Sequence, residues 1–457
     1  MSAAGFLELL VCPRCGGGLT EGDAAGVLGC GACRVSYQAL QGIPCLFADP
    51  RRQLADWQRQ LGVYQALLAH GVRSMGEQLE AFDLLPAARQ RVQRLRAAAE
   101  DNGERMLAML RMAGLELPEP GKEARAPEDL ESGFTLIEYY DHILRDWAWD
   151  GDSDENARAR DLVLEALDGA GGRALGKVLV LGAGACRLAY DLHQRCKPEL
   201  TVALDISPLF LVAAKRVMFG SGLDLVEFPA FPVDGPSVCL ERQLRAPAGA
   251  PARFHLLLAD AFAAPLRRQA FDTVLTPWFI DIVPVDIRRT LSVIHTLLAP
   301  GGRWVNHGPL NYQKQHPHAQ RYTLDELLAL ARLAGFAPGE ARAERLPLLA
   351  SRASANARLE RVFTFVAGKQ EQPSADQNSE PPPWLLFSHL PIPRFPGLDR
   401  YQPQHAVLAF VARAIDGTAT LGDLSARMVK EQGARPDAAL EGTRALVKLL
   451  RDECRKA

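Results

Sequence analysis

The sequence predicts an α/β fold built on a mostly parallel sheet, with smaller modules at both ends of the chain. Short apolar runs of strand length recur between residues 177 and 367, and helical patterns lie between several of them. A glycine-rich turn follows the first of these runs directly. Alternating strands and helices favour a parallel sheet whose two faces are both covered by helices.

The strands are expected at residues 177–181, 201–204, 254–259, 271–276, 303–306 and 361–367. Most of these runs are apolar at consecutive positions, as expected for strands that are buried on both faces. Apolar residues at helical spacing over 209–217 and 287–298 predict two of the intervening helices. Residues 220–253 are rich in Pro and Gly, and we interpret them as an insertion between strands.

Composition divides the chain of 457 residues into five segments. Cys and Gly are frequent in the first, and helical patterns ending in a Pro-containing loop fill the second. The α/β pattern follows, and then a polar, Pro-rich linker leads to a small helical domain. The segments are residues 1–48, 49–138, 139–368, 369–403 and 404–457.

Charge and hydropathy argue against several classes of protein. The 52 basic and 54 acidic residues give a net charge of −2, which provides no overall electrostatic attraction for nucleic acid or an anionic membrane. No apolar run approaches the roughly 20 residues that span a bilayer, and no basic segment precedes a signal-like stretch. The nine cysteines, an odd number, suit a reducing compartment, so we expect a cytoplasmic protein.

Two cysteine pairs, Cys12-Pro-Arg-Cys15 and Cys30-Gly-Ala-Cys33, predict a metal site. Each pair places two thiolates on one tight turn, and two such turns complete the tetrahedral shell that zinc prefers. Four cysteines leave no position for a reactive water, so the predicted zinc is structural. The segment has little apolar mass of its own, and bound metal would supply its stability. Cys45 is more simply a core residue than a fifth ligand.

The turn after the first strand contains Gly182 and Gly184, which permit a sharp turn and a close approach of a ligand to the backbone. Asp205 ends the second strand, where a carboxylate can accept both ribose hydroxyls of a nucleoside. Asp260 follows the third strand and can accept the adenine amino group. This pattern fits NAD and S-adenosylmethionine alike, although Arg187 at the third glycine position of a dinucleotide fingerprint weakens the NAD interpretation.

The later elements narrow this choice. An acidic residue, Asp272, begins the fourth strand, and a helix and the turn Pro300-Gly301-Gly302 lead into the fifth. This order resembles that of the class I methyltransferases. The resemblance implies a Rossmann-like fold with a mostly parallel seven-stranded sheet and S-adenosylmethionine as cofactor.

Four stretches resemble one branch, the carnosine N-methyltransferase family. They are residues 144–161 (LRDWAWDGDSDENARARD), 276–312 (TPWFIDIV…GPLNY), 321–336 (RYTLDELLALARLAGF) and the glycine-rich LGAGACRLAYDL. The resemblance spans about residues 139–368. Family members methylate an imidazole ring nitrogen of a His-containing dipeptide, which implies an N-methyltransferase of a small molecule or peptide with an imidazole acceptor.

The resemblance also implies roles for individual residues. Arg145 would hold the methionine carboxylate of the cofactor, and Asp281 would face the substrate as the catalytic residue. Tyr312 ends the Gly-Pro-Leu-x-Tyr motif, and Gln313 stands where the family has a substrate-binding histidine. Cys186 replaces a family glycine, and a substrate-pocket tyrosine of the family has no clear match around residues 358–361. The cofactor half therefore transfers better than the dipeptide.

Simpler roles for these residues remain open. Arg145 can pair with a nearby acid, Asp281 can cap the helix that follows Pro284, and Tyr312 can belong to the core. For the whole protein, the alternatives are a protein or RNA methyltransferase that docks its substrate through the terminal modules, or a non-catalytic scaffold. The intact glycine-rich turn and Asp205 argue against a scaffold.

The two terminal modules carry resemblances of their own. Residues 6–48, through the Cys pairs, Tyr37 and Gly42-Ile43-Pro44, resemble small zinc-ribbon activator proteins that bind and stabilise methyltransferases. Here such a module would be fused to the domain it activates. Residues 404–457 are interpreted first as a plain helical appendage. Through the turn Asp416-Gly417 they also resemble winged-helix peptide-chaperone modules, a resemblance that implies a protein or peptide partner.

Overall fold

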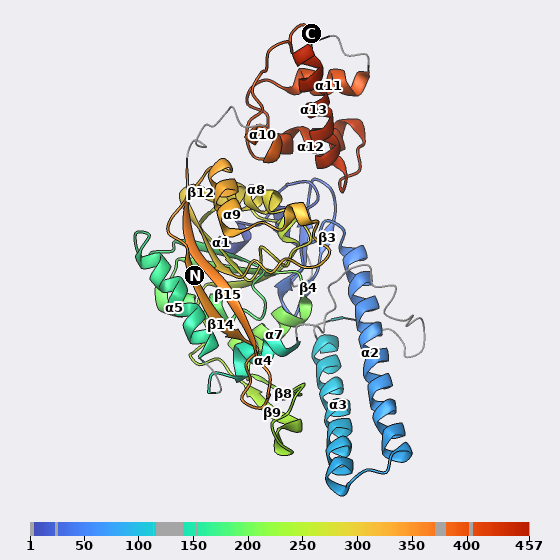
Figure 1. Cartoon of the computed structure of the whole chain (residues 1–457). Helices are drawn as coiled ribbons and strands as arrows, with labels where there is room; N and C mark the ends of the chain where they lie inside the picture. The colour runs from blue at the N-terminus through green and yellow to red at the C-terminus, as the bar shows by residue number, and fades with distance from the viewer. Residues whose placement is uncertain are drawn as a thin grey trace.

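The computed structural model describes residues 4–22, 26–112, 114–115, 140–151, 154–370, 381–401 and 405–456. The loop expected at 116–133, the start of the α/β segment at 139 and much of the expected linker lie outside these ranges. In Figure 1 the central sheet lies between helical layers, the helices α2 and α3 form a long hairpin at one side, and the C-terminal helices form a separate group.

The central sheet has the strand order β10-β7-β6-β11-β12-β15-β13, and β14 also pairs with β15. The first five strands in this order are parallel, and β15 is antiparallel to β12. The strand order reverses between β6 and β11, which makes that point a topological switch. The strands are β6 (Lys177–Leu181), β7 (Leu200–Asp205), β10 (Phe254–Leu258), β11 (Phe271–Pro277), β12 (Leu298–Gly308), β13 (Phe336–Pro338), β14 (Arg342–Leu348) and β15 (Arg358–Lys369).

The sheet has eight strands because one expected strand position is divided between two short strands. β13 pairs with the end of β15, from Ala367 to Lys369. β14 pairs with the preceding part of β15, from Arg358 to Thr364. The predicted mostly parallel, Rossmann-like architecture is otherwise the one observed.

Both faces of the sheet are buried, as the continuous apolar runs predict. Along β6, Val178 and Val180 belong to one core cluster, and Leu179 and Leu181 belong to the other. This alternation follows from the period of two in a strand. The covering helices are α5 (Glu155–Asp168), α6 (Arg187–Cys196), α7 (Pro208–Phe219), α8 (Ile287–Leu297) and α9 (Leu324–Leu333).

The N-terminal module lies against the free edge of this sheet, strand β10. The amide of Leu46 donates to the carbonyl of Leu258 at 2.8 Å, and the amide of Val11 donates to Pro265 at 2.9 Å. The module thereby covers an edge that would otherwise present unpaired backbone groups. It contains α1 (Ala4–Leu7) and the short strands β1 (Leu19–Glu21), β2 (Leu28–Cys30), β3 (Ser36–Tyr37), β4 (Ala39–Leu40) and β5 (Ile43–Pro44).

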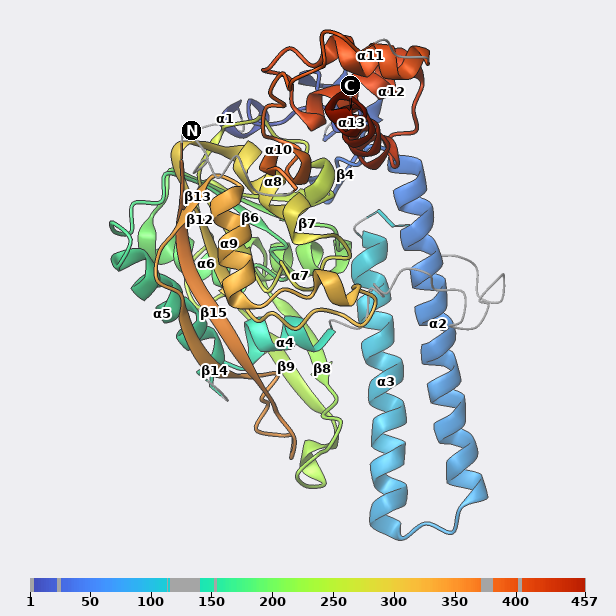
Figure 2. The ribbon, with the colours of Figure 1, turned by 45° about the horizontal axis from the view of Figure 1, so that its top comes forward.

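Two long antiparallel helices, α2 (Pro50–Ala81) and α3 (Pro86–Met112), project past the sheet (Figure 2). Asp49 caps α2 by accepting from Arg52 N at 3.1 Å, and Pro at the first helical position favours the start there. The expected insertion contains a hairpin of β8 (Leu223–Glu227) and β9 (Leu240–Leu244). It holds α3 through hydrogen bonds that include Asn102 Oδ1 with Val226 N, at 2.9 Å.

The C-terminal helices α10 (Pro383–Leu386), α11 (Ala406–Ala414), α12 (Leu421–Gln432) and α13 (Ala439–Lys456) surround a core cluster of their own. The residues just after α10 pack against the larger domain, because Phe387 and Leu390 belong to the core on one face of the sheet. No helix in the described ranges combines the length and the hydropathy needed to cross a bilayer.

Candidate functional site

A cavity of about 930 Å³ lies beyond the carboxyl ends of β6, β7, β10 and β11. Ligands bind at this position in open α/β sheets, at the topological switch between β6 and β11. The volume accommodates a nucleoside cofactor together with a small acceptor. Seven of the residues proposed from the sequence line this cavity: Arg145, Gly182, Gly184, Asp205, Asp260, Asp281 and Gln313.

The glycine-rich turn adopts backbone conformations that side chains resist. Gly182 has φ +67°, and a Cβ on it would lie 2.4 Å from Phe279 Cδ2. Gly184 has φ +55°. Cys186, which begins α6, also has a positive φ of +71°. Glycine adopts this region without strain, which explains why the related family has glycine there.

Asp205, at the end of β7, is held by the backbone on both carboxylate oxygens. Oδ2 accepts from Gly184 N and Oδ1 accepts from Ser207 N, each at 2.8 Å. Burial raises the pKa of Asp205 to about 6, against the lowering effect of these bonds. Each carboxylate oxygen retains a lone pair for a further donor, so the carboxylate can accept two ribose hydroxyls.

We expect Asp205→Ala to weaken binding of S-adenosylmethionine by about 1.5–3 kcal/mol, since it removes hydrogen bonds to a charged group. Calorimetry on the folded variant measures this change, with Asp224→Ala, an exposed site on β8 that does not line the cavity, as the control. Wild-type affinity in a folded Asp205→Ala protein would rule out the ribose role.

The part of the cavity beyond the end of β10 contains Asp260 and an aromatic pair. Asp260 Oδ1 caps a short helix by accepting from Phe262 N at 2.8 Å, and its second oxygen is not used in this cap. The ring of Phe262 stacks on Phe279 with centroids 6.1 Å apart, and Arg289 lies 5.1 Å over Phe262. Phe262 and Arg289 also line the cavity, although nothing in their local sequence predicts it.

Arg145 lies on α4 (Tyr140–Ala148) with its side chain 14% exposed. Its Nε and Nη2 donate to Asp146 Oδ1 at 2.9 and 2.6 Å, and Glu155 Oε1 is 3.7 Å away. The simpler role, pairing with a nearby acid, is therefore observed. It does not exclude a ligand, because a guanidinium has five N–H donors and Arg145 also lines the cavity.

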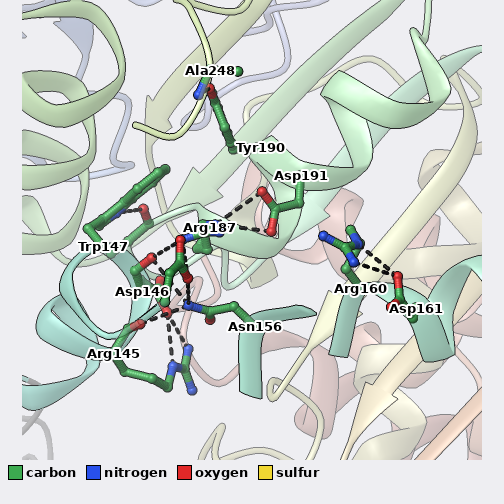
Figure 3. A network of polar contacts seen from close by, with 12 residues as sticks. Arg145, Asp146, Trp147, Asn156, Arg160, Asp161, Arg187, Tyr190, Asp191 and Ala248 are labelled. Atoms are coloured by element: carbon green, nitrogen blue, oxygen red, sulfur yellow. Dashed lines mark hydrogen bonds and ion pairs between the residues drawn. The ribbon is translucent and has the colours of Figure 1, made fainter. Parts of the chain in front are cut away.

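A polar network holds α4 against the glycine-rich turn (Figure 3). Trp147 Nε1 donates to Ala185 O at 2.8 Å. Arg187 donates to the backbone carbonyl of Asp146 at 2.7 Å and to both oxygens of Asp191 at 3.0 Å. Arg187 therefore anchors α4, and hence Arg145, to the turn, in the position where a dinucleotide fingerprint has glycine.

Asp281 lines the cavity just after β11 and is 1% exposed. Its Oδ2 accepts from Asn311 N at 2.8 Å. Its Oδ1 is buried and has no partner among the described residues. Burial raises the pKa of Asp281 to about 6. The alternative role as a helix cap is wrong, because Asp286 caps α8 by accepting from Arg288 N at 2.8 Å.

The remaining proposed substrate residues differ in their placement. Gln313 lines the cavity, whereas Tyr312 is not among the lining residues. The Tyr312 hydroxyl is buried without a partner in the described part of the chain, and its ring packs on His316 at 5.5 Å. Trp278 lines the cavity with a left-handed φ of +43°, and its Nε1 is buried and unpaired among the described residues.

Several residues that line the cavity come from segments in which no sequence motif predicts a site. The first turns of α2 contribute polar and charged side chains, and β15 contributes an ion pair. No local motif marks them, and only the tertiary fold brings them to the cavity. They are Arg52, Gln53, Asp56, Trp57, Arg59, Gln60, His142, Arg358 and Glu360.

The four predicted metal ligands lie together in the N-terminal module. The sulfurs of Cys12, Cys15, Cys30 and Cys33 all lie within 4.8 Å of one another, and two of the pairs are 3.5 Å apart. Sulfurs bound tetrahedrally to zinc are roughly 3.8 Å apart, so this set fits the ion. The hydroxyl of Tyr37 lies 3.1 Å from Cys12 Sγ and can donate to a thiolate there.

Two parts of the chain are similar in sequence to known proteins. Residues 242–345 match the sequence model of the family described as carnosine N-methyltransferase. A carnosine N-methyltransferase of Dictyostelium discoideum is 35% identical over 81 residues, 18% of this chain and 16% of that protein. A UPF0434 protein of Paraburkholderia phymatum is 42% identical over 53 residues, 12% of this chain and 79% of that protein.

Among solved structures, a chain from the complex of the Haloferax volcanii Trm112 methyltransferase activator with a methyltransferase is 14% identical, with a TM-score of 0.33. The similarity covers 52% of this chain and 96% of that one. The predicted α/β fold is confirmed. The carnosine N-methyltransferase match and the four clustered cysteines support the two predicted cofactors, S-adenosylmethionine and structural zinc. Residues 242–345 of the central domain are thus similar to the carnosine N-methyltransferases, and through its N-terminal segment the chain belongs to the UPF0434 family.

Proposed function

We propose that this protein transfers the methyl group of S-adenosylmethionine to a ring nitrogen of an imidazole in a small, His-containing acceptor. The observation that supports this most is the state of Asp281. One carboxylate oxygen is fixed by Asn311, and the other is buried in the cavity wall without a partner among the described residues. A buried acceptor atom of this kind suits a ligand N–H donor.

The sulfonium cofactor supplies an already activated methyl group, so the protein mainly needs to align the reactants and exclude water. In our proposal, the N–H of the acceptor imidazole donates to Asp281 Oδ1. That bond selects the tautomer whose other nitrogen carries a free lone pair facing the cofactor. After transfer, the imidazolium can pass its proton to the same carboxylate.

The cofactor-binding roles are proposals of the same kind. Arg145 binds the methionine carboxylate, and the turn at Gly182 and Gly184 follows the cofactor backbone. Asp205 binds the ribose and Asp260 the adenine amino group. Their common placement around one cavity supports this assignment.

We further propose that the five segments expected from composition act as separate units of one enzyme. The zinc module, docked on β10 by backbone hydrogen bonds, stabilises the catalytic domain from within the same chain. Gln313, which lines the cavity, contacts the acceptor directly. Tyr312, which does not line it, packs behind the residues that do. The C-terminal helical unit is proposed as a docking site for a peptide or protein.

A transfer assay tests the proposed function. With methyl-labelled cofactor and β-alanylhistidine, we expect label in the dipeptide, and fragmentation together with NMR should place it on an imidazole nitrogen. Addition of S-adenosylhomocysteine should suppress the transfer. Label that enters the α-amino group, or a dipeptide left unlabelled by a cofactor-binding protein, would contradict an imidazole acceptor.

A further inference from the structure

The last strand of the sheet brings an ion pair to the wall of the cavity. Side chains of a strand alternate between its faces, and Thr364, Val362 and Glu360 share the buried face of β15. Thr364 bonds His307, and Val362 packs with apolar neighbours. Glu360 continues this buried row at the cavity, where its side chain is only 7% exposed.

A buried carboxylate is costly unless it is paired. Arg358 lies two residues earlier on the same face and donates through Nη2 to Glu360 Oε1. The Arg358 side chain is 61% exposed, so the pair lies where the protein meets the cavity. Within the described ranges no protein group donates to the second oxygen, Oε2, which leaves it for a ligand.

Glu360 and Asp281 both line the cavity, and their charges interact. Burial is the main cause that raises the pKa of Asp281, and the charge of Glu360 adds to it. Arg145, which also lines the cavity, is paired with Asp146. Asp281 and Glu360 thus each bring to the cavity wall a carboxylate with one oxygen that no described protein group uses, and such an oxygen can accept a charge-assisted hydrogen bond from a cationic donor.

We propose that Glu360 is a specificity-determining residue that binds a cationic group, such as a primary ammonium, on the acceptor. The acceptor class is then an imidazole that carries an amine beside the ring oriented by Asp281. This inference rests on the proposed function, because it takes the acceptor nitrogen to lie at Asp281.

A pair of acceptors that differ by one charge tests this role. β-Alanylhistidine has a free ammonium, and its N-acetyl derivative does not. We expect wild-type kcat/KM to favour the free amine by roughly tenfold to a hundredfold, the range for one hydrogen bond to a charged group. Glu360→Gln should lose this preference through a higher KM for the free amine, without a change in affinity for S-adenosylhomocysteine.

Two further variants separate recognition from a structural role. Glu344→Gln removes a carboxylate from β14 that pairs with Arg158 and does not line the cavity, so the preference should persist. Glu360→Asp keeps the charge and should retain part of the preference. Equal kcat/KM for the two acceptors in the wild type, or an undiminished preference in folded Glu360→Gln, would overturn the inference. Transfer to neither dipeptide would contradict the proposed acceptor itself, together with this inference.

Discussion

Replacing Asp281 with asparagine is expected to lower the rate of methyl transfer about a hundredfold or more, the usual range for a positioned acid–base group. Asparagine keeps the shape and can still accept from Asn311 N. It cannot carry the negative charge that stabilises and deprotonates an imidazolium. Affinity for S-adenosylmethionine, measured by calorimetry, should barely change, because in our proposal Asp281 binds the acceptor and not the cofactor.

The pH dependence of the wild type should show the same group. Since burial raises the pKa of Asp281 to about 6, the carboxylate is protonated below that pH and ionised above it. The ionised form is the proton acceptor, so kcat/KM should rise with pH through about 6. In Asp281→Asn only the limb that belongs to the acceptor imidazole, with an ordinary pKa of about 6.5, should remain.

Asp286→Asn is the matched control for Asp281→Asn. Asp286 caps α8 five residues further along the chain and does not line the cavity. Asparagine caps a helix nearly as well as aspartate, so transfer should stay within about twofold of the wild type. Near-normal turnover by Asp281→Asn, with a known acceptor, would remove Asp281 from the mechanism.

Replacing Cys30 with serine is expected to abolish stoichiometric zinc binding and to destabilise the N-terminal module. The sulfur of Cys30 completes a four-thiolate set, and structural zinc in such sites contributes about 10–16 kcal/mol of apparent binding free energy. A module of very short strands cannot replace that contribution. Loss of its fold also exposes the edge of β10, so the thermal midpoint of the whole chain should fall.

Metal analysis and thermal unfolding measure these two effects. Cys239→Ser is the control, since Cys239 lies on the β8–β9 insertion and is not one of the four clustered thiols. It should retain one zinc per chain and a near-normal midpoint. Retention of a full equivalent of zinc by Cys30→Ser would show that the four cysteines do not form one site.

The sequence predicts well that the glycine-rich turn and the ends of the neighbouring strands line the cavity, because the motifs that predict this are local. Gly182 and Gly184 follow a strand whose continuous apolar run, Lys177–Leu181, is fixed by burial on both faces. The side chains that end the neighbouring strands then meet at one edge of the sheet. Position in the chain therefore determines position in space for Asp205 and Asp260.

The acceptor half depends on contacts that no local pattern encodes. Glu360 reaches the cavity only because β15 pairs antiparallel with β12, and Trp57 only because the zinc module that precedes α2 is bonded to β10. Asp281 and Asp286 both precede α8, and the sequence does not show which of them caps it. Arg187 is a different case. It stands where a dinucleotide motif has glycine, and its side chain anchors α4 by a hydrogen bond to the carbonyl of Asp146.

Titration with S-adenosylhomocysteine and, separately, with NAD tests the identity of the cofactor site most directly. We expect one equivalent of S-adenosylhomocysteine to bind per chain, with a gain of about 2.7 kcal/mol in the free energy of unfolding at a ligand concentration one hundred times Kd. NAD should bind far more weakly and should not compete. Tight binding of NAD, or no binding of S-adenosylhomocysteine to the zinc-loaded protein, would contradict a methyltransferase site in this cavity.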